Sequence, residues 1–432
     1  MNVLVTGATG FIASQIVTDL IAAGHAVTCC VRDVSYAKKI FPSANILSCD
    51  FDQDITVENW LPRLTNIDIV INCVGILYHP RIKKIWNIHY HTPRAMFDAC
   101  VQSGIKQIIQ ISALGIEHSE VAFARSKMAT DDYLLSLPVK SIVLRPSLVY
   151  GHGSYGGTSL FRGLAGLPGL IPVPGKGEQQ FQPIHLQDLS LSIVKLITSP
   201  PDHNMILNAV GPDRVSLLEI VSKLRAWLGF ASAKFIFIPL KLMKMVAHIG
   251  DLLPGSVVNS TSYRMMIQDN NTSEEETRKF QHYAGFKPRD FSSGIYSLPS
   301  AVQDRWHARL YFLKPLLRIS IAFIWLFSAA CSLIFYPRSD SYHLLVQVGI
   351  QDFWQPVFLY GASALDAVIG IAMLCSYRLK AVCIVQLAVI ILYTTIISWK
   401  LPYLWLEPFG PIAKNIPLFV AILIYIAMES DR

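Results

Sequence analysis

The sequence predicts a two-part chain: a doubly wound parallel α/β sheet with a small C-terminal lobe, followed by an all-α bundle of four transmembrane helices. Two observations predict the first part. Strand-like apolar runs alternate with helical patterns over residues 1–150, and the first strand leads into a glycine turn and a helix. Four long apolar stretches after residue 315 predict the second part. A chain of 432 residues is also too long for one ordinary domain.

The glycine turn lies in the N-terminal stretch MNVLVTGATGFIAS, between an expected strand at Asn2–Thr6 and an expected helix at Phe11–Ala23. Gly7 permits the tight turn, and Gly10 lets a pyrophosphate approach the backbone at the helix N-terminus. Ala13 supplies the small third residue that close packing of helix and strand requires. An ordinary strand-to-helix turn is the alternative. Because the motif follows a strand and opens a helix, it predicts nucleotide binding.

Further strands and helices follow in alternation, and the ligand of such a sheet lies at the carboxyl ends of its strands. The strands are expected at Ala26–Val31, Asn45–Cys49, Ile67–Cys73, Gln107–Ser112 and Ser141–Leu144, and helices include Arg94–Gln102 and Ala124–Ser136.

The residue after the second strand helps to choose the dinucleotide. An acid at this position usually binds the adenosine ribose in NAD sites, whereas Arg32 in Val31-Arg32-Asp33 can pair with a 2′-phosphate. We therefore expect NADP, with NAD still possible through Asp33. Asp50, after the third strand, is placed to meet the adenine amino group. The expected cofactor-binding residues in the turn and at the strand ends are Gly7, Thr9, Gly10, Phe11, Ile12, Arg32, Asp50, Phe51, Asn72, Val74 and Gly75.

Seven short motifs occur in an informative order over residues 1–290: TGATGFIA, VRD, NCVGI, ISALGI, RSK, LRPSLVYG and PIHLQDL. In this order they resemble the extended short-chain dehydrogenases/reductases of the NAD-dependent epimerase/dehydratase superfamily. The similarity is greatest to the atypical branch that contains the accessory NAD(P)H-binding subunit of respiratory complex I. The resemblance implies a Rossmann sheet and a nicotinamide cofactor.

Active members of that superfamily use a serine, and a tyrosine and a lysine spaced Y-x-x-x-K on one helix face. By this resemblance Ser112 and Lys127 are the candidate catalytic residues, and Lys127 also binds the nicotinamide ribose. The tyrosine position holds Phe123, which has no proton to exchange. His118 and Tyr133 are weak substitutes, because His118 is expected in a loop and Tyr133 lies off the helical register. The site is thus expected to bind a cofactor and to lack the usual acid–base group.

The NAD(P)-binding domain is expected over residues 1–300, with a closing lobe mainly at 152–182 and 205–300. The glycine- and proline-rich stretch 151–177 predicts a loop across the cleft. In Pro183-Ile184-His185-Leu186-Gln187-Asp188 we expect Asp188 to cap a helix. Further elements are expected at Met205–Ala209, Leu217–Leu228 and Lys234–Ile238. The apolar segment Pro239–Leu253 is interpreted as an ordinary helix, and a surface lying on the bilayer is the alternative.

Residues 301–315 are expected to be a juxtamembrane linker, and residues 316–432 a transmembrane domain that resembles the DoxX-like family. Its expected spans are residues 316–335, 357–376, 379–397 and 412–428. The bias of Lys and Arg among the loops predicts a multi-pass protein of a bacterial inner membrane, with the N-terminal domain and the C-terminus in the cytoplasm. Asp366 and Gln386 lie near the middle of spans, where a hydrogen bond between helices is favoured over a functional role.

Composition excludes some partners and sites. Hydrophobic residues make up 52% of the chain, which is too apolar for a wholly soluble protein. The net charge is +7, but no basic run is interleaved with aromatics, so no nucleic acid is expected. The eight cysteines show no metal-ligand spacing, so no metal is expected either.

Three functions remain open from the sequence. The first is a membrane-anchored NAD(P)H-binding protein that senses cofactor or supports a respiratory or membrane complex. The second is an active oxidoreductase, epimerase or dehydratase on a lipophilic substrate such as a quinone, an isoprenoid or a sterol-like lipid. The third is a membrane scaffold with a structural dinucleotide fold. Phe123 disfavours the second, and the intact glycine turn disfavours the third.

Overall fold

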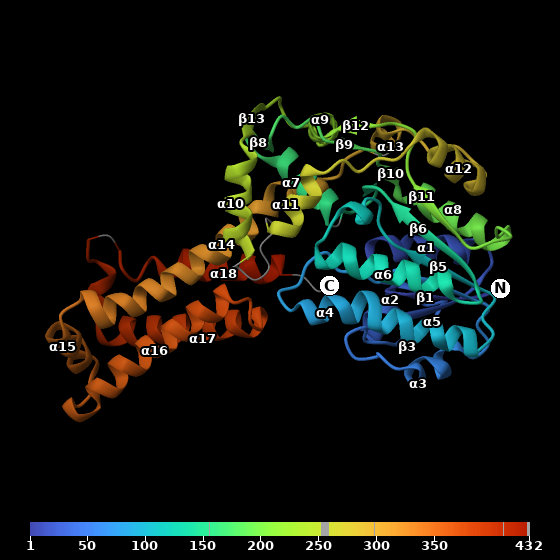
Figure 1. The fold of residues 1–432 in the computed structure, drawn as a ribbon. Helices are drawn as coiled ribbons and strands as arrows, with labels where there is room; N and C mark the ends of the chain where they lie inside the picture. The colour runs from blue at the N-terminus through green and yellow to red at the C-terminus, as the bar shows by residue number, and fades with distance from the viewer. Residues whose placement is uncertain (155, 252–258, 298, 409, 430–432) are drawn as a thin grey trace. The chain divides into compact units, whose positions relative to one another are not determined.

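A computed structural model describes residues 1–154, 156–251, 259–297, 299–408 and 410–429 (Figure 1). The chain divides into two compact units. Unit 1 holds Met1–His248 and Val258–Ala308, and unit 2 holds Ile249–Val257 and Arg309–Arg432. Each unit is described by itself below.

Within the described residues of unit 1, seven strands form one parallel sheet in the order β11-β6-β5-β4-β1-β2-β3. This arrangement confirms the predicted doubly wound Rossmann sheet. The strands are β1 (Asn2–Thr6), β2 (Ala26–Val31), β3 (Asn45–Ser48), β4 (Ile69–Asn72), β5 (Gln107–Ile111), β6 (Lys140–Pro146) and β11 (Met205–Ala209).

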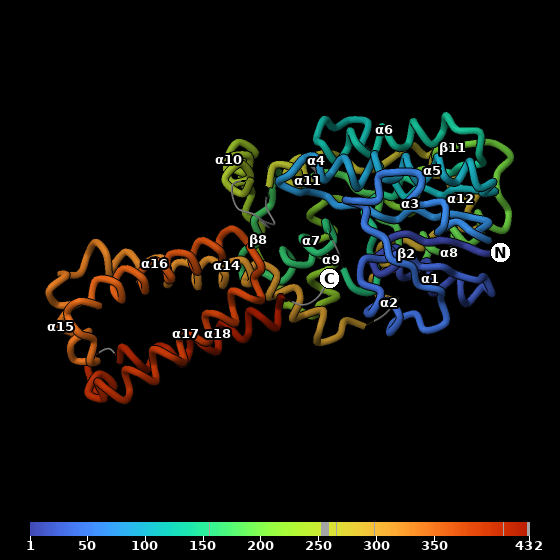
Figure 2. Tube along the Cα trace, turned by 90° about the horizontal axis from the view of Figure 1, so that it is seen from below, coloured from blue at the N-terminus to red at the C-terminus, as the bar shows by residue number. Residues whose placement is uncertain are grey.

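Helices cover both faces of this sheet (Figure 2). Successive residues of a strand point to opposite faces, and accordingly Val3 and Val5 belong to one core whereas Leu4 belongs to the other. The first core includes residues of α1, α8 and α12, and the second includes residues of α3, α5 and α6. The helices of this half are α1 (Phe11–Ala22), α2 (Val34–Ile40), α3 (Val57–Trp60), α4 (Ile82–Trp86), α5 (Thr92–Gln102), α6 (Ala122–Ser136), α8 (Leu186–Thr198) and α12 (Glu274–Ala284).

The second lobe contains short strand pairs and helices. Its strands pair as β7 with β10, β9 with β12, and β8 with β13. The strands are β7 (Val149–Tyr150), β8 (Leu170–Pro174), β9 (Gln180–Phe181), β10 (Ile184–His185), β12 (Val215–Ser216) and β13 (Lys234–Ile238). The helices are α7 (Gly157–Gly166), α9 (Leu217–Trp227), α10 (Leu240–Asp251), α11 (Ser260–Ile267) and α13 (Phe291–Tyr296).

The prediction of a loop over residues 151–177 is wrong, because α7 and β8 lie within it. Leu160, Phe161 and Leu164 are buried on α7, so apolar packing outweighs the glycine content of this stretch. The positive-φ glycines lie outside the two elements, as at Gly156 before α7 and Gly175 after β8. The glycines mark the turns here, and they do not prevent regular structure between them.

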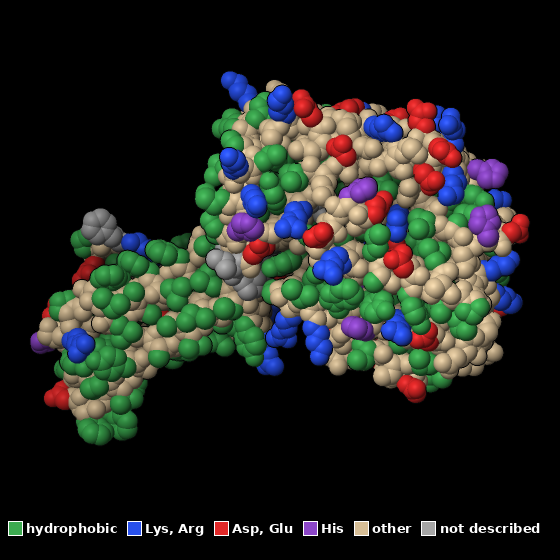
Figure 3. Space-filling view, viewed as in Figure 1, with side chains coloured by type: hydrophobic (Ala, Val, Ile, Leu, Met, Phe, Trp, Pro, Cys, Tyr) green, Lys and Arg blue, Asp and Glu red, His purple; other side chains and the backbone are tan. Residues whose placement is uncertain are grey.

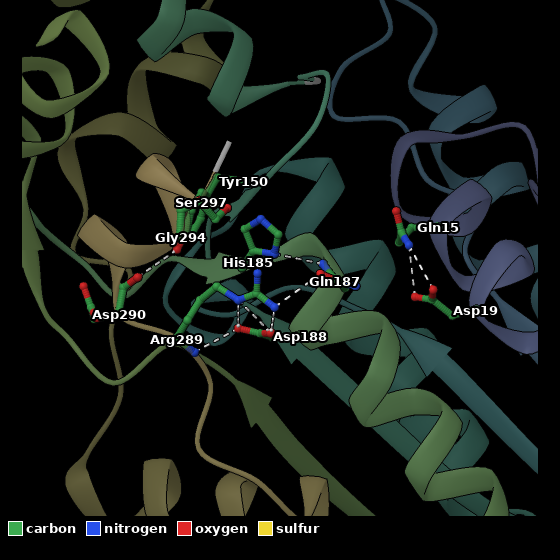
Figure 4. Close-up of polar contacts among 10 residues, drawn as sticks. All are labelled: Gln15, Asp19, Tyr150, His185, Gln187, Asp188, Arg289, Asp290, Gly294 and Ser297. Atoms are coloured by element: carbon green, nitrogen blue, oxygen red, sulfur yellow. Dashed lines mark hydrogen bonds and ion pairs between the residues drawn. The ribbon is translucent and has the colours of Figure 1, made fainter. Parts of the chain in front are cut away.

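The expected capping role of Asp188 is also wrong. His185 caps α8, since its Nδ1 accepts the Gln187 N–H at 3.2 Å. Asp188 instead binds Arg289, with Nη2 2.7 Å from Oδ1 and the Arg289 N–H donating to Oδ2 at 2.9 Å (Figure 4). Burial and the nearby Arg289 lower the pKa of His185 to about 4, so the capping imidazole stays neutral. The Asp188–Arg289 pair joins α8 to the segment that precedes α13.

Unit 2 is helical. The helix α14 (Val302–Ala330) begins within unit 1 and belongs to unit 2 from Arg309. It continues through a π-helical turn at Cys331–Phe335, so residues 301–315, predicted as a linker, lie almost entirely within a helix. The other helices are α15 (Arg338–Val348), which the sequence did not predict, α16 (Gln355–Leu374), α17 (Leu379–Lys400) and α18 (Asn415–Met428).

Among the described residues, three helical segments are long and apolar enough to span a membrane: Val302–Phe335, Asp352–Leu374 and Leu379–Lys400. The fourth predicted span is a helix of 14 residues, Asn415–Met428. At 1.5 Å per residue it covers about 21 Å, less than a hydrocarbon core of about 30 Å. Pro417 lies in its first turn, where a proline is tolerated because no helical N–H is needed. The sequence-based boundary at residue 412 was therefore too early.

Several polar contacts join the helices of unit 2, and two of them involve the polar residues predicted near the middle of spans. The indole N–H of Trp325 on α14 donates to Gln386 on α17 at 2.8 Å, and Ser328 Oγ donates to Asp366 on α16 at 2.8 Å. Both acceptors are buried. These bonds between helices agree with the structural role predicted for Asp366 and Gln386.

Candidate functional site

The strand order reverses at β1, which pairs with β2 on one side and with β4 on the other. In doubly wound sheets, ligands bind at the carboxyl ends of the strands at such a point. Gly7 follows β1, and Val74 lies just beyond β4. The two are in contact, since a Cβ on Gly7 would lie 2.9 Å from Val74 Cγ2. Gly7 also has φ +65°, so both the space and the backbone conformation require glycine here.

The N-terminus of α1 opens beside this contact. Gly10 is the N-cap residue and makes no side-chain cap hydrogen bond. Thr9 and Gly10 are exposed, and Phe11 and Ile12 are half-buried. A Cβ on Gly10 would lie 3.0 Å from the Gly7 carbonyl oxygen. First-turn amide groups with no side-chain acceptor, next to glycines that keep the backbone accessible, fit a pyrophosphate.

The ends of β2 and β3 carry the residues expected near the adenosine. Arg32 is exposed. Asp33 caps α2, because its Oδ1 accepts the Tyr36 N–H at 2.9 Å and the Ser35 hydroxyl at 2.7 Å. These hydrogen bonds lower the pKa of Asp33. A carboxylate engaged in capping is a poorer partner for ribose hydroxyls than the free acid of a typical NAD site.

The expected residues at the ends of β3 and β4 differ in exposure. Asp50 is exposed, and its Oδ1 accepts the Asp52 N–H at 3.0 Å. The ring of Phe51 is buried against Trp60, so it does not face the edge of the sheet. Asn72 is buried as well and bonds to Thr6 on β1 and Gln110 on β5, both at 2.7 Å. Asn72 therefore joins three strands beneath the site.

Lys127 lies near Phe123 and bonds to the residue that precedes Ser112. Lys127 Nζ lies 5.8 Å from the centre of the Phe123 ring and donates to the Ile111 carbonyl at 2.9 Å. Ser112 Oγ donates to Asp131 Oδ2 at 2.7 Å. Phe123 is 8% exposed and belongs to an apolar cluster with Ile116 and Ala124. The position that would hold the acid–base tyrosine is thus part of an apolar wall.

Two buried residues of this region, His89 and Asp131, were not predicted from the sequence. The Ile76 N–H donates to His89 Nε2 at 3.0 Å, so the ring proton lies on Nδ1, 2.9 Å from Ser126 Oγ. His89 is therefore neutral, and burial lowers its pKa well below the usual value. Asp131 is fully buried and pairs with Arg145, whose Nη2 lies 3.1 Å from Oδ2. Its spacing of four residues from Lys127 was the available signal, whereas His89 had none.

Burial shifts the pKa values of the two charged residues in opposite senses. The pKa of Lys127 falls to about 8 because its ammonium is desolvated, although Asp131 opposes the shift. The pKa of Asp131 rises to about 6 for the same reason, opposed by the Ser112 hydrogen bond and by Arg145. Gly75 lies directly over the lysine, since a Cβ there would be 3.5 Å from Lys127 Nζ.

The two suggested substitutes for the missing tyrosine lie in different surroundings. Tyr133 donates its hydroxyl to Asp98 and stacks under Arg94, 4.9 Å from the ring centre. His118 ends a short 3₁₀ turn. Phe123 also lines a small cavity of about 30 Å³. The other walls of this cavity come from residues within 114–124 and from residues 268–270. It has room for about one or two water molecules. Among the described residues, no cluster of three His, Cys, Asp or Glu side chains could hold a metal ion.

The shifted pKa of Lys127 predicts a pH dependence of stability. Its folded pKa of about 8 lies below the ordinary 10.5, so between these values the folded chain binds fewer protons than the unfolded chain. The free energy of unfolding attributable to Lys127 must therefore rise with pH from about 8 to 10.5. We expect Lys127→Met to remove this rise and to stabilise the cofactor-free protein by about 3 kcal/mol at pH 7. Denaturant unfolding at several pH values measures this rise in unfolding free energy. The exposed Lys38→Met should leave the rise unchanged, and an unchanged rise in Lys127→Met would contradict the assignment.

Two known protein families match parts of this chain. Residues 3–209 match the NAD dependent epimerase/dehydratase family, and residues 322–423 match the DoxX-like family. Residues 3–209 thus form an NAD-dependent epimerase/dehydratase-like domain, and residues 322–423 form a DoxX-like domain. The three long apolar helices agree with a membrane protein.

Individual relatives come from several functional groups. Divinyl chlorophyllide a 8-vinyl-reductase of Arabidopsis thaliana is 24% identical over 70% of this chain and 79% of its own length. Subunit 9 of the NADH dehydrogenase [ubiquinone] 1 alpha subcomplex of Mus musculus is 24% identical over 57% of this chain and 66% of its own. Ceramide reductase of Caulobacter vibrioides is 24% identical over 51% and 68%.

Solved structures share the fold. MoeE5 in complex with UDP-glucose and NAD superposes with a TM-score of 0.53 at 19% identity, over 72% of this chain and 100% of its own. UDP-glucuronic acid 4-epimerase of Bacillus cereus, in complex with UDP-glucuronic acid and NAD, gives 0.52 at 16% identity, over 72% and 100%. Family and fold support the binding of NAD or NADP.

Proposed function

We propose that this protein is a membrane-anchored NADPH-binding protein without tyrosine-dependent chemistry, which senses the cofactor or supports a membrane complex. The observation that carries the proposal is Phe123 in the tyrosine position, buried in an apolar cluster beside Lys127. A phenyl ring can pack on a nicotinamide but cannot transfer a proton. Ser112 and Lys127, the other two expected members, already have partners in Asp131 and the Ile111 carbonyl.

The preference for NADPH rests on the end of β2. Arg32 is exposed and presents a guanidinium suited to a 2′-phosphate. Asp33 caps α2 and is less available to ribose hydroxyls. NADH remains a possible ligand, because Asp33 Oδ2 accepts none of the cap hydrogen bonds.

The supporting role rests more loosely on a relative. Mouse subunit 9 bears the name of a subunit of NADH dehydrogenase [ubiquinone] 1, and it is similar to this chain over 255 residues. We propose a respiratory or other membrane complex as the partner. From the Lys and Arg bias of the loops, we also propose a bacterial inner membrane with unit 1 in the cytoplasm. The C-terminus lies on the same side when α18 and the residues before it complete a fourth crossing.

A reductase acting on a lipophilic substrate is the second candidate, and one observation favours it. Lys127 is buried beneath Gly75 with a pKa of about 8, close to the value suited to a proton donor at neutral pH. In such a reaction the cofactor supplies the hydride and Lys127 the proton. Two relatives are named as reductases, of a vinyl group and of a ceramide.

Titration of the full chain in lipid nanodiscs tests the proposal. We expect NADPH to enhance nicotinamide fluorescence and to bind more tightly than NADH. Arg32→Ala should weaken NADPH binding about ten-fold, equivalent to one lost charge-assisted contact of about 1.4 kcal/mol, and leave NADH binding unchanged. The exposed Arg278→Ala on α12 is the matched control and should change neither affinity. If neither dinucleotide binds, the scaffold interpretation replaces this one.

A second experiment, an assay of NADPH oxidation, distinguishes the non-catalytic protein from the reductase. NADPH oxidation is followed with quinone, isoprenoid and ceramide-class substrates in the wild type and in Phe123→Tyr. The non-catalytic proposal expects no turnover in the wild type, and at most a gained activity in Phe123→Tyr. Wild-type turnover that is lost in Lys127→Met, with NADPH still bound, would establish the reductase instead.

A further inference from the structure

The helix α10 presents an apolar face to solvent. Leu242, Met245 and Val246 are 44%, 54% and 43% exposed, although each is a large apolar residue. In this part of the helix only Ala247 is fully buried. At 3.6 residues per turn, Leu242 and Met245 lie on the side of the helix opposite Ala247, and Val246 lies at the border of that side. The apolar face therefore points away from unit 1.

The neighbouring strand extends this apolar surface along the chain. Ile236 and Phe237 of β13 are 42% and 54% exposed, and only Pro239 separates β13 from the first residue of α10. We call Ile236, Phe237, Leu242, Met245 and Val246 the α10 face. Figure 3 shows hydrophobic side chains with Lys and Arg side chains among them along the edge of unit 1 that carries α10 and β13.

The charged residues from Lys234 to Lys244 are all lysines, and Asp251 is the acidic residue that ends α10. Lys234, Lys241 and Lys244 are exposed, and residues 234–248 contain no acidic residue. On the helical period, Lys241 and Lys244 lie along one flank of the exposed apolar side, between it and the buried side. An apolar face with a lysine flank is the pattern of a helix that lies in a membrane interface.

The helix is held in place from its inner side. The hydroxyl of Tyr263 on α11 donates to the Leu240 carbonyl at 3.0 Å, and Tyr263 itself is buried. This bond ties the start of α10 to α11. The exposed apolar residues favour the bilayer alternative over the ordinary helix expected for this segment.

We infer that the α10 face binds the interfacial region of a bilayer that contains anionic lipids. The apolar side chains enter the boundary between headgroups and acyl chains, and the lysines pair with lipid phosphates. The occupant is a bilayer because the same chain carries spanning helices, which keep unit 1 within reach of a membrane. Positive flanks also complement anionic headgroups. The inference is independent of NADPH binding, since none of these residues lies at the carboxyl edge of the sheet.

A site-specific fluorophore tests the contact in the full chain. Met245→Cys is labelled with an environment-sensitive dye on a Cys375→Ser background, because Cys375 is an exposed thiol. The matched control is Glu275→Cys, an exposed position on α12. Each is reconstituted in nanodiscs with anionic or zwitterionic lipid, with and without spin-labelled lipid. Thermal unfolding verifies that each variant is folded.

We expect spin-labelled lipid to quench the dye at position 245 at least about two-fold in anionic nanodiscs, and not to quench it at position 275. Zwitterionic lipid, or the Lys241→Glu/Lys244→Glu pair, should reduce the quenching. A water-like spectrum at position 245 in both lipids would overturn the inference. An apolar spectrum without lipid quenching would overturn it in favour of a protein on this face, and quenching indifferent to lipid charge and to the lysines would overturn the anionic assignment.

Discussion

Replacing Gly7 with alanine is expected to weaken NADPH binding at least about ten-fold, because the turn between β1 and α1 cannot keep its shape. The added Cβ would lie 2.9 Å from Val74 Cγ2, and the residue would hold a φ of +65°. A left-handed conformation costs a residue with a Cβ about 1–2 kcal/mol, which corresponds to about ten-fold in affinity when the turn relaxes away from it. The relaxation displaces the N-terminus of α1, where we place the pyrophosphate.

Gly24→Ala is the matched control for this substitution. Gly24 follows α1 with φ +80°, and a Cβ there would meet nothing within 4 Å. We expect a loss of about 1 kcal/mol in unfolding free energy and no change in NADPH affinity. Titration of nicotinamide fluorescence and denaturant unfolding give both quantities for each variant. Equal affinities in Gly7→Ala and the wild type would show that the dinucleotide does not bind at this turn.

Removing the Asp131 carboxylate is expected to lower the free energy of unfolding by about 3–5 kcal/mol. Asp131 is fully buried, and Arg145, only 8% exposed, is its ion-pair partner. In Asp131→Ala the Arg145 guanidinium stays desolvated. Its remaining ion-pair partner among the described residues is Glu117, whose Oε2 lies 3.6 Å from Arg145 Nη1. Ser112 loses its acceptor in the same step. The loss therefore comes mainly from a stranded buried charge, and it should appear in denaturant unfolding at pH 7.

Two further variants show whether burial is the cause. Glu219→Ala breaks a half-buried surface pair with Lys223 on α9 and should cost no more than about 0.5 kcal/mol. The Asp131→Ala/Arg145→Met double variant should be more stable than Asp131→Ala alone, because it removes the stranded cation as well. A double variant that is less stable than the single one would contradict this explanation.

The strands and the glycine turn could be predicted from the sequence because each has a local cause. The expected bounds of β2 agree with the structure at Ala26–Val31, and those of β1 at Asn2–Thr6. Buried parallel strands form continuous apolar runs, and glycine at a left-handed position has no common substitute. The three long apolar helices could be predicted for the same reason, since length and apolarity along the chain are sufficient to identify them.

Features that depend on packing were predicted less well. The start of α18 was placed too early, α15 was not expected, and residues 151–177 proved to contain α7 and β8. Composition marks where turns can occur. It does not show whether the residues between them find an apolar surface to cover, which is what made α7 a helix.

The sequence by itself determined the order of the strands along the chain, the glycine turn and the long apolar helices, because these follow from local periodicity and composition. The tertiary structure alone decided which buried polar groups are partners. His89 meets Ser126 across 37 residues, and Asp188 meets Arg289 across 101. Such pairs leave no periodic signal, since a buried polar group requires a partner in space and the fold decides which residue supplies it.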